Sequence, residues 1–400
     1  MENIRKDFPL LQYYPNLIYL DNAATTQKPH CVLQRILDYY QKENANVHRS
    51  VHFLGELATL HYEQARNTVA RFLHAPSAKN IVFTRGTTES INLVAYSWGR
   101  TFLKKNMVIL VSEIEHHANL IPWQVLAKEL DLSLRYIPCR QDGSLDLDSL
   151  DSLIHENVGI ISISYASNSL GCIHPVEMII TKAHKYNIPV LLDAAQMVPH
   201  REINVQKLDC DFLAFSGHKM CGPTGIGVLY AKESWLEKMI PFQTGGEMIR
   251  AVWIDHATYN DIPYKFEAGT PPICEAIALA TAIEYLQNIG MDKIAHHSLK
   301  LRKCAWNALQ NIDNVRLLGN QEDNVGILSF IYPKIHPHDL AQYLDEHNIA
   351  VRAGHHCAQP LLRKMGLTAT TRISFYLYNN EQEIDILVEQ IYKAKKFFLG

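Results

Sequence analysis

The sequence lacks the features that mark secreted, membrane-spanning and nucleic-acid-binding proteins. No apolar run approaches the ~18 residues that a membrane span requires, and the opening stretch MENIRKDFPLLQYYPNLIYL has neither a signal-peptide core nor an Arg/Ser-rich transit pattern. The formal net charge of −3 gives no electrostatic reason to expect nucleic acid or an anionic membrane as a partner. We therefore expect a soluble, cytoplasmic protein that binds neither of them.

Closely paired cysteines are also missing. The eight cysteines are scattered and none forms a C-x-x-C pair, which argues against a disulfide framework and against a structural zinc site. Most of these thiols are expected to be small core residues. Only Cys357 has unusual neighbours, in the stretch RAGHHCAQPL (352–361). Taken alone, that stretch fits a metal site, a structural crossing of polar side chains, or a reactive thiol.

Internal repeats and low-complexity linkers are absent, and 400 residues suggest about two or three closely packed domains. Between residues 80 and 230, short β-branched apolar runs alternate with segments of helical spacing, which predicts an α/β sheet of mostly parallel strands with a ligand crevice at their carboxyl ends. The predicted strands are NIVFT (80–84), MVILV (107–111), VGIISISYA (158–166), IPVLLDAAQ (188–196), CDFLAFS (210–216) and GIGVLYA (225–231).

After FEAGTPP (266–272) the pattern changes to that of an α+β unit. One long helix or two helices are expected over 274–312, and the chain should close on an amphipathic helix over 381–398. We therefore predict a large α/β domain over 16–265 and a smaller α+β domain formed by 1–15 and 266–400, which carries the Cys357 loop. Two strand-like runs belong to the smaller domain, VGILSFIY (325–332) and TRISFYLY (371–378).

Three predicted strand ends carry polar or small hydroxyl residues of the kind that bind ligands. Gly86–Thr88 offer small hydroxyl residues at a helix N-terminus, suited to a phosphate, although an N-cap box explains them equally well. Asp193 ends an apolar strand, so it needs a cationic partner or caps a helix. Lys219 follows another strand in a tight loop beside Ser216 and His218, a setting that favours Schiff-base chemistry. An acid for a pyridinium nitrogen, an amine and a phosphate cradle are the groups that pyridoxal 5′-phosphate requires, so together they predict this cofactor.

The adjacent histidines His116 and His117 follow a further strand in SEIEHHANL. Neighbouring side chains point in different directions, so the pair is not suited to chelating one metal ion. Either one imidazole lies over an aromatic ring of a ligand, or both are ordinary loop residues.

Characteristic short stretches occur from one end of the chain to the other. They are YLDNAATTQKP (19–29), NVHRSVH (46–52), RGTTESINLVA (85–95), EHHAN (115–119), SNSLG (167–171), LLDAAQ (191–196), FSGHKMCGPTGIGVLY (215–230), GGEMI (245–249), FEAGTP (266–271), VRAGHHCAQP (351–360) and TRISFYLYN (371–379). In these stretches the whole chain resembles the fold-type I, class V aminotransferase-like enzymes, and most closely the SufS/CsdA group of cysteine desulfurases. The turn GPTGIG and the compact RxGxHC loop favour this group over IscS/NifS-like enzymes. The resemblance implies a large domain with a mostly parallel seven-stranded sheet and a smaller α+β C-terminal domain.

This resemblance also implies roles for individual residues. It makes Lys219 the Schiff-base lysine and Cys357 the cysteine that carries a persulfide, while His116 stacks on the cofactor ring and takes part in proton transfer. Asp193 is expected to pair with the pyridinium nitrogen and Gln196 to hydrogen-bond the phenolic oxygen. The implied phosphate ligands are Thr87, Thr88, Ser216, His218 and, from a partner subunit, Thr270; the implied substrate ligands are Arg372 for the carboxylate, with Asn168, His48 and Arg352 nearby.

The reaction implied is conversion of L-cysteine to L-alanine by a homodimer, with the sulfur passing through Cys357 to a SufE- or SufU-like acceptor for iron–sulfur cluster assembly. Arg352, His355 or His356 is expected to favour the thiolate. Cys221, next to the lysine loop, is expected to pack rather than react. The alternatives are selenocysteine lyase activity, a class V aminotransferase or kynureninase-like reaction, and a metal-binding or sulfur-carrier protein that uses residues 355–357.

Overall fold

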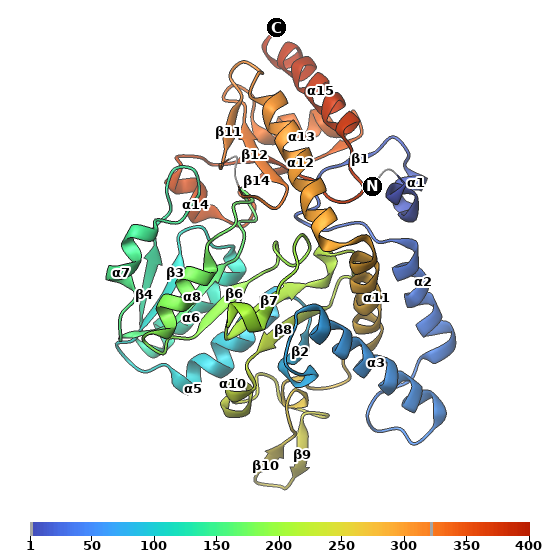
Figure 1. Cartoon of the computed structure of the whole chain (residues 1–400), viewed down its shortest axis with the longest axis vertical. Helices are drawn as coiled ribbons and strands as arrows, with labels where there is room; N and C mark the ends of the chain where they lie inside the picture. The colour runs from blue at the N-terminus through green and yellow to red at the C-terminus, as the bar shows by residue number, and fades with distance from the viewer. Residues whose placement is uncertain (1–2, 321–322) are drawn as a thin grey trace.

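A seven-stranded sheet forms the centre of the computed structural model, which describes residues 3–320 and 323–400 (Figure 1). Its strand order is β2-β8-β7-β6-β5-β3-β4. Strands β3 to β7 run parallel to one another, and β8 is antiparallel to both β2 and β7. The strands are β2 (Ile81–Thr84), β3 (Val108–Ser112), β4 (Ser133–Ile137), β5 (Val158–Ser164), β6 (Val190–Asp193), β7 (Phe212–Ser216) and β8 (Gly227–Ala231).

The predicted fold class, a mostly parallel α/β sheet, is confirmed. Every strand predicted from an apolar run is present, but the edge strand β4 was not recognised. Its sequence SLRYI leaves most side chains exposed or half-buried, so it lacks the continuous apolar run by which a parallel strand buried on both faces is recognised.

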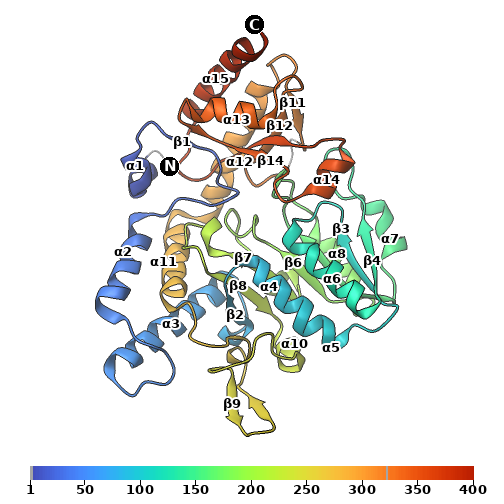
Figure 2. The same ribbon diagram turned by 180° about the vertical axis from the view of Figure 1, so that it is seen from behind.

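Helices cover both faces of this sheet (Figures 1 and 2). Successive residues of one strand point to opposite faces, and in β6 Leu192 packs into one core cluster while Leu191 packs into another. The first cluster includes α3 (Phe53–Phe72), α8 (Val176–His184) and α11 (Ile273–Ile289), and the second includes α4 (Thr87–Leu93) and α6 (Ile121–Leu130).

A second, four-stranded antiparallel sheet has the order β11-β12-β15-β14. The helix predicted over 274–312 is two helices, because Gly290 between them adopts a φ of 99° that ends α11. The elements of this part are α12 (Met291–Leu309), β11 (Arg316–Leu318), β12 (Ile327–Ile331), α13 (Pro337–Asp345), β14 (Arg352–Gly354), α14 (Gln359–Lys364), β15 (Thr370–Ser374) and α15 (Glu381–Leu399).

The N-terminal segment crosses between the two sheets. Strand β1 (Ile18–Tyr19) pairs in parallel with β13 (Ile349–Ala350) beside the second sheet. Residues 18–20 therefore lie with the C-terminal part, a few residues beyond the predicted boundary at 15. Conversely, α11 packs on α3 and on α2 (His30–Asp38) of the N-terminal part.

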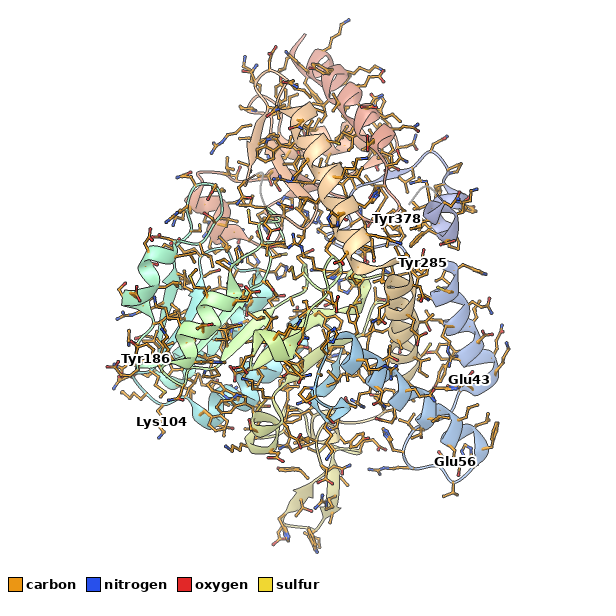
Figure 3. All side chains as sticks on the ribbon, viewed as in Figure 1. Glu43, Glu56, Lys104, Tyr186, Tyr285 and Tyr378 are labelled. Carbon is orange, nitrogen blue, oxygen red and sulfur yellow. The ribbon has the colours of Figure 1, made fainter. Side chains whose placement is uncertain are left out.

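Aromatic side chains fill the junction between the N-terminal segment, α11 and the segment that follows β15 (Figure 3). The Phe8 ring lies 4.7 Å from that of Tyr378 and 6.1 Å from that of Tyr285, both in edge-on contact. The Tyr285 hydroxyl also donates to Asp7 at 2.8 Å. The N-terminus is thus fixed against α11 and against the segment that follows β15.

The remaining elements lie at the periphery. The hairpin of β9 and β10 projects at the end of the molecule opposite α15 (Figure 1). No helix within 3–320 or 323–400 is long and apolar enough to cross a membrane. The peripheral elements are α1 (Pro9–Tyr13), α5 (Arg100–Phe102), α7 (Leu150–Leu153), α9 (Val205–Leu208), α10 (Glu233–Lys238), β9 (Ile249–Val252) and β10 (Ala257–Tyr259).

We predict that Gly227→Ala destabilises the fold at the point where β8 passes the turn before α4. A Cβ on Gly227 would lie 2.4 Å from the Gly86 Cα, and a backbone atom does not move aside as the end of a flexible side chain can. The expected loss is about 1–3 kcal/mol, measured by urea unfolding. Gly246→Ala is the control, because its Cβ would meet no atom within 4 Å. Equal unfolding free energies for the two variants would contradict the prediction.

Candidate active site

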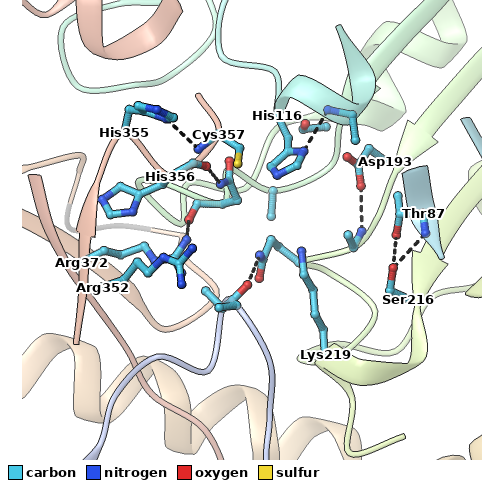
Figure 4. Close-up of a pocket in the computed structure, with 18 of the residues that line it drawn as sticks. Thr87, His116, Asp193, Ser216, Lys219, Arg352, His355, His356, Cys357 and Arg372 are labelled. Atoms are coloured by element: carbon cyan, nitrogen blue, oxygen red, sulfur yellow. Dashed lines mark hydrogen bonds between the residues drawn. The ribbon is translucent and has the colours of Figure 1, made fainter. Parts of the chain in front are cut away.

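A cavity of about 520 Å³ lies at the carboxyl ends of β5, β6 and β7, and the segment around β14 forms its other wall (Figure 4). Its position matches the crevice expected for a parallel sheet, because the strand ends and helix starts converge there. The predicted site residues that line it are Thr87, Thr88, His116, Asn168, Asp193, Gln196, Ser216, His218, Lys219, Arg352, Cys357 and Arg372.

Two predicted residues, His48 and Thr270, lie outside this cavity. The His48 ring packs edge-on against Tyr264 at 5.0 Å, and its Nε2 is 3.0 Å from a Glu63 oxygen. Thr270 lines a separate hollow with Arg85. His48 and the neighbours of Thr270, Gly269 and Pro271, share a third hollow of about 210 Å³. The two residues therefore belong to one region of this chain, away from Lys219.

Lys219 follows β7 and its side chain reaches into the cavity (Figure 4). Burial lowers the pKa of its amine and the Arg372 charge lowers it further, while Asp193 acts in the opposite direction. A lowered pKa increases the fraction of neutral amine, the form that attacks a carbonyl carbon or accepts a proton.

Asp193, the last residue of β6, is 5% exposed and accepts one backbone hydrogen bond, from the Ala195 N–H at 3.0 Å. Burial raises the pKa of this carboxyl, and the Lys219 charge partly offsets the effect. A buried carboxyl of this kind is suited to a cationic ligand nitrogen that faces the cavity. A carboxylate in this position is the acceptor that a pyridinium N–H requires.

His116 lines the same cavity from the loop after β3. Its Nδ1 accepts a hydrogen bond from the Ala118 N–H at 3.0 Å, so the proton of the neutral ring lies on Nε2. Burial, helped by the Lys219 charge, lowers the pKa of His116 to about 3. The imidazole is therefore uncharged near neutrality and can lie flat on an aromatic ring.

At the other side of the cavity, the start of α4 meets the end of β7. The Ser216 hydroxyl oxygen lies 2.8 Å from the Thr87 N–H and 2.7 Å from the Thr87 hydroxyl (Figure 4). Burial lowers the pKa of His218 to about 4, so its ring is neutral as well. These hydroxyls, with Thr88, present donors of the type that hold a phosphate group. The residues present thus fit pyridoxal 5′-phosphate along its whole length.

Arg372 on β15 is the buried cation of the cavity. Its Nη2 donates to Asp21 at 2.9 Å and its Nη1 to the Asn168 carbonyl at 2.9 Å. Its Nε has no partner among the described residues. Arg352, on the neighbouring strand, is largely exposed and 3.7 Å from Asp21. A buried guanidinium with a spare donor is suited to a substrate carboxylate.

The loop that carries Cys357 is hydrogen-bonded at several points. The Cys357 carbonyl accepts from the His117 N–H at 2.8 Å, and the Asn168 amide donates to the His356 carbonyl at 2.5 Å. Both His356 and Cys357 adopt positive φ angles, 51° and 56°. Such backbone costs about 1–2 kcal/mol per residue and is typical of functional sites. Cys357 itself is exposed at the cavity.

The two histidines of this loop have different environments. His355 Nδ1 accepts from the Cys357 N–H at 3.3 Å, whereas His356 is buried with its Nε2 2.7 Å from the Thr370 hydroxyl. Burial lowers the pKa of His356 to about 3, so this ring supplies no positive charge to the thiol near neutrality. Within the described ranges, no three His, Cys, Asp or Glu side chains are grouped to hold a metal ion.

Cys221, next to the lysine loop, is fully buried. Burial raises the pKa of its thiol to about 12. Because the thiolate is the reactive form, Cys221 is a poor nucleophile and has the environment of a packing residue.

Sequence reasoning missed two carboxylates that support the site, the half-buried Asp21 and the buried Glu115. Glu115 accepts hydrogen bonds from the hydroxyls of Ser112 and Ser164, the Asn119 amide and the Ser164 N–H. It holds the segment that places His116, and burial raises its pKa to about 7. Both acids lie within motifs quoted above, but no pattern of single residues distinguishes them from surface acids.

The chain is similar over nearly its whole length to known proteins of one family. The family described as aminotransferase class-V matches residues 18–387. A probable cysteine desulfurase of Halalkalibacterium halodurans is 48% identical over 99% of this chain and 98% of its own length. A cysteine desulfurase of Haloferax volcanii is 42% identical over 100% of this chain and 97% of its own length.

Two solved structures are similar over the whole chain. The apo cysteine desulfurase of Thermococcus onnurineus NA1 has a TM-score of 0.95 at 41% identity, with 99% of this chain and 98% of that one covered. The cysteine desulfurase CsdA of Escherichia coli has a TM-score of 0.93 at 40% identity, with the same coverage.

We predict that Glu115 makes the protein less stable as the pH rises. Because its pKa is raised to about 7 in the folded chain, the folded state holds a proton that the unfolded chain has lost above its ordinary value of ~4.3. Stability should fall by about 1–3 kcal/mol between about pH 4.5 and about pH 7 through this group.

Glu115→Gln should flatten that dependence, and urea unfolding across the same range measures it. Glu156→Gln, at an exposed position, is the control. An unchanged slope in Glu115→Gln would show that the carboxyl is ionised in the folded protein.

Proposed function

This chain belongs to the cysteine desulfurases of the class-V aminotransferase family, and we propose that it removes sulfur from L-cysteine with Lys219 and Cys357 as its catalytic residues. One observation carries the proposal: a lysine amine, a buried arginine and an exposed thiol line the same cavity. The amine and the arginine suit an amino acid held at its Cα and carboxylate. The thiol provides an acceptor for the substrate sulfur. A reaction that only moved protons at the substrate would not need such an acceptor.

Pyridoxal 5′-phosphate is the cofactor that these residues would hold. Lys219 would bind its aldehyde, Asp193 its pyridinium nitrogen and Gln196 its phenolic oxygen, with His116 on the ring. Thr87, Thr88, Ser216 and His218 would hold the phosphate. When bound, this group withdraws electrons from the substrate Cα.

The first task of the protein is to hold the substrate and remove a proton. Arg372 binds the carboxylate through its spare Nε donor, and Arg352 and Asn168 lie beside it. Burial lowers the pKa of the Lys219 amine, and in its neutral form this amine accepts the proton from Cα.

The second task is sulfur transfer. The Cys357 thiolate attacks the sulfur of L-cysteine, an S–S bond forms and the substrate Cβ–S bond breaks. The electron pair of the broken bond stays with carbon and is protonated, so L-cysteine and the enzyme thiol yield L-alanine and a Cys357 persulfide. No external oxidant or reductant is needed for this step.

The persulfide must then reach an acceptor. Because Cys357 is exposed, its outer sulfur is open to the thiol of a second protein. We propose a small SufE- or SufU-like acceptor, with the sulfur destined for iron–sulfur cluster assembly.

We also propose that the enzyme is a homodimer in which His48 and Thr270 serve the partner's cavity. Both lie outside the cavity of their own chain and near one another. A second copy facing this region would bring Thr270 to the phosphate and His48 to the substrate.

We predict that Cys357→Ser lowers alanine and persulfide formation from L-cysteine by about 100-fold, because serine is a poor nucleophile toward sulfur. The change in the visible spectrum on adding L-cysteine should remain, since Lys219 and Asp193 are untouched. Alanine and sulfide would be measured together, with and without reductant.

Cys31→Ser, at another exposed cysteine, is the control. Wild-type sulfur transfer by Cys357→Ser would refute the role of Cys357, and formation of pyruvate in place of alanine would indicate an aminotransferase. Selenide release from selenocysteine by Cys357→Ser would indicate an additional selenocysteine lyase activity.

We predict that Thr270 acts across the dimer. A heterodimer of one Lys219→Ala chain and one Thr270→Val chain contains one site with both residues intact if Thr270 serves the partner, so about half the wild-type activity should return. Each variant homodimer is the control. Failure of the heterodimer to exceed the Thr270→Val homodimer would contradict the arrangement.

A further inference from the structure

The carbonyl of His218, which belongs to the peptide bond leading into Lys219, has an unusual number of donors around it. The Thr26 N–H and the Thr25 hydroxyl lie 3.0 Å from this oxygen, and the Thr26 hydroxyl and the Lys28 ammonium lie 3.2 Å from it. A carbonyl oxygen has two lone pairs. Four donors on one oxygen therefore form a polar clamp, and all of them come from the segment 25–28.

Lys28 is the charged member of this clamp. Its ammonium also contacts the Thr26 carbonyl and the Thr25 hydroxyl, so its protons are directed to these uncharged groups. No ion pair within the described part of the chain includes Lys28, and burial lowers its pKa to about 8. A desolvated cation without a carboxylate is costly, and the mechanism above makes no use of it.

The clamp fixes the backbone just before Lys219. The Cys221 N–H donates to the Thr26 hydroxyl at 2.8 Å, so the same segment holds the lysine loop on both sides of Lys219. The Lys28 charge also acts on the site, since it is one of the causes that lower the pKa of His218. The titratable groups around Lys28 are His218 and Cys221 of the lysine loop and Tyr378 next to Gln27. Cys31 and Tyr376 lie beyond Cys221.

We propose that Lys28 is a positioning residue for Lys219: its ammonium clamps the peptide between His218 and Lys219 and places a positive charge behind the cofactor lysine. The inference rests on the proposed function, in which Lys219 binds pyridoxal 5′-phosphate. Lys28 touches neither substrate nor cofactor and acts through the backbone that carries them.

The test is a pH titration of the visible absorption of the holoenzyme in the absence of substrate. Lys28→Met keeps the length of the side chain and removes the charge. The midpoint should rise by about 0.5 pH unit or more, because a neighbouring positive charge disfavours protonation at Lys219. Lys28→Arg, which restores the charge, should titrate within about 0.2 pH unit of wild type.

Lys334→Met, at an exposed lysine, is the matched control. A purely structural role would lower the stability of Lys28→Met without moving the midpoint, and would overturn the inference. It is equally overturned if Lys28→Arg shifts the midpoint as far as Lys28→Met does.

Thr25→Val removes an uncharged donor from the same clamp and serves if Lys28→Met does not fold. Amide hydrogen exchange in residues 217–222 of the Thr25→Val holoenzyme should be about 10-fold faster than in wild type. Unchanged exchange there would refute the clamp.

Borohydride reduction followed by peptide mapping separates this inference from the proposed function. If wild type carries the cofactor on a residue other than Lys219, the proposed function fails. If Lys219 is labelled in wild type and in Lys28→Met but their midpoints agree, only the role of Lys28 fails.

Discussion

The ion pair between the buried Arg372 and the half-buried Asp21 is the contact on which the geometry of the cavity depends. It joins a strand of the C-terminal sheet to the segment that leaves β1. The same guanidinium holds the Asn168 carbonyl, and the Asn168 amide in turn holds the His356 carbonyl. The position of Cys357 is therefore tied through one arginine to the N-terminal segment and to the end of β5. A guanidinium suits this task because its donors are fixed in a plane and remain charged when buried.

The electrostatic character of the cavity follows from which groups stay charged. Burial makes His116, His218 and His356 neutral near physiological pH, so these rings contribute shape and hydrogen bonds. The persistent positive charge comes from Arg372, with Lys28 behind the lysine loop. An amino acid carboxylate and a phosphate are both anions, and a cavity with a buried cation attracts them. The same burial lowers the pKa of the Lys219 amine, which favours its action as a base.

Much of this arrangement could be predicted from the sequence, because a buried parallel strand is an apolar run and the polar residue that ends it is easily recognised. Asp193, Lys219 and the turn at Gly86 are all of this type. The edge strand β4 was not predicted because most of its side chains are exposed or half-buried. Three further residues, Glu115, Asp21 and Lys28, could not be predicted for another reason. What makes them important is their partners, which are distant in sequence. Asp21 pairs with Arg372, and Lys28 donates to the His218 carbonyl. The separation of His48 and Thr270 from the cavity likewise depends on how the chain folds in three dimensions.

The break at Gly290 divides the helical connection between the two sheets. Helix α11 packs into the core of the large sheet, whereas Leu301 and Ala305 of α12 pack into the core of the second sheet. Lys219 follows a strand of the large sheet, whereas Cys357 lies between β14 of the second sheet and α14, whose Leu361 and Leu362 pack into the core of the large sheet. The thiol therefore sits at the seam between the two cores, so the same packing that joins the two sheets also sets the distance between the lysine amine and the thiol.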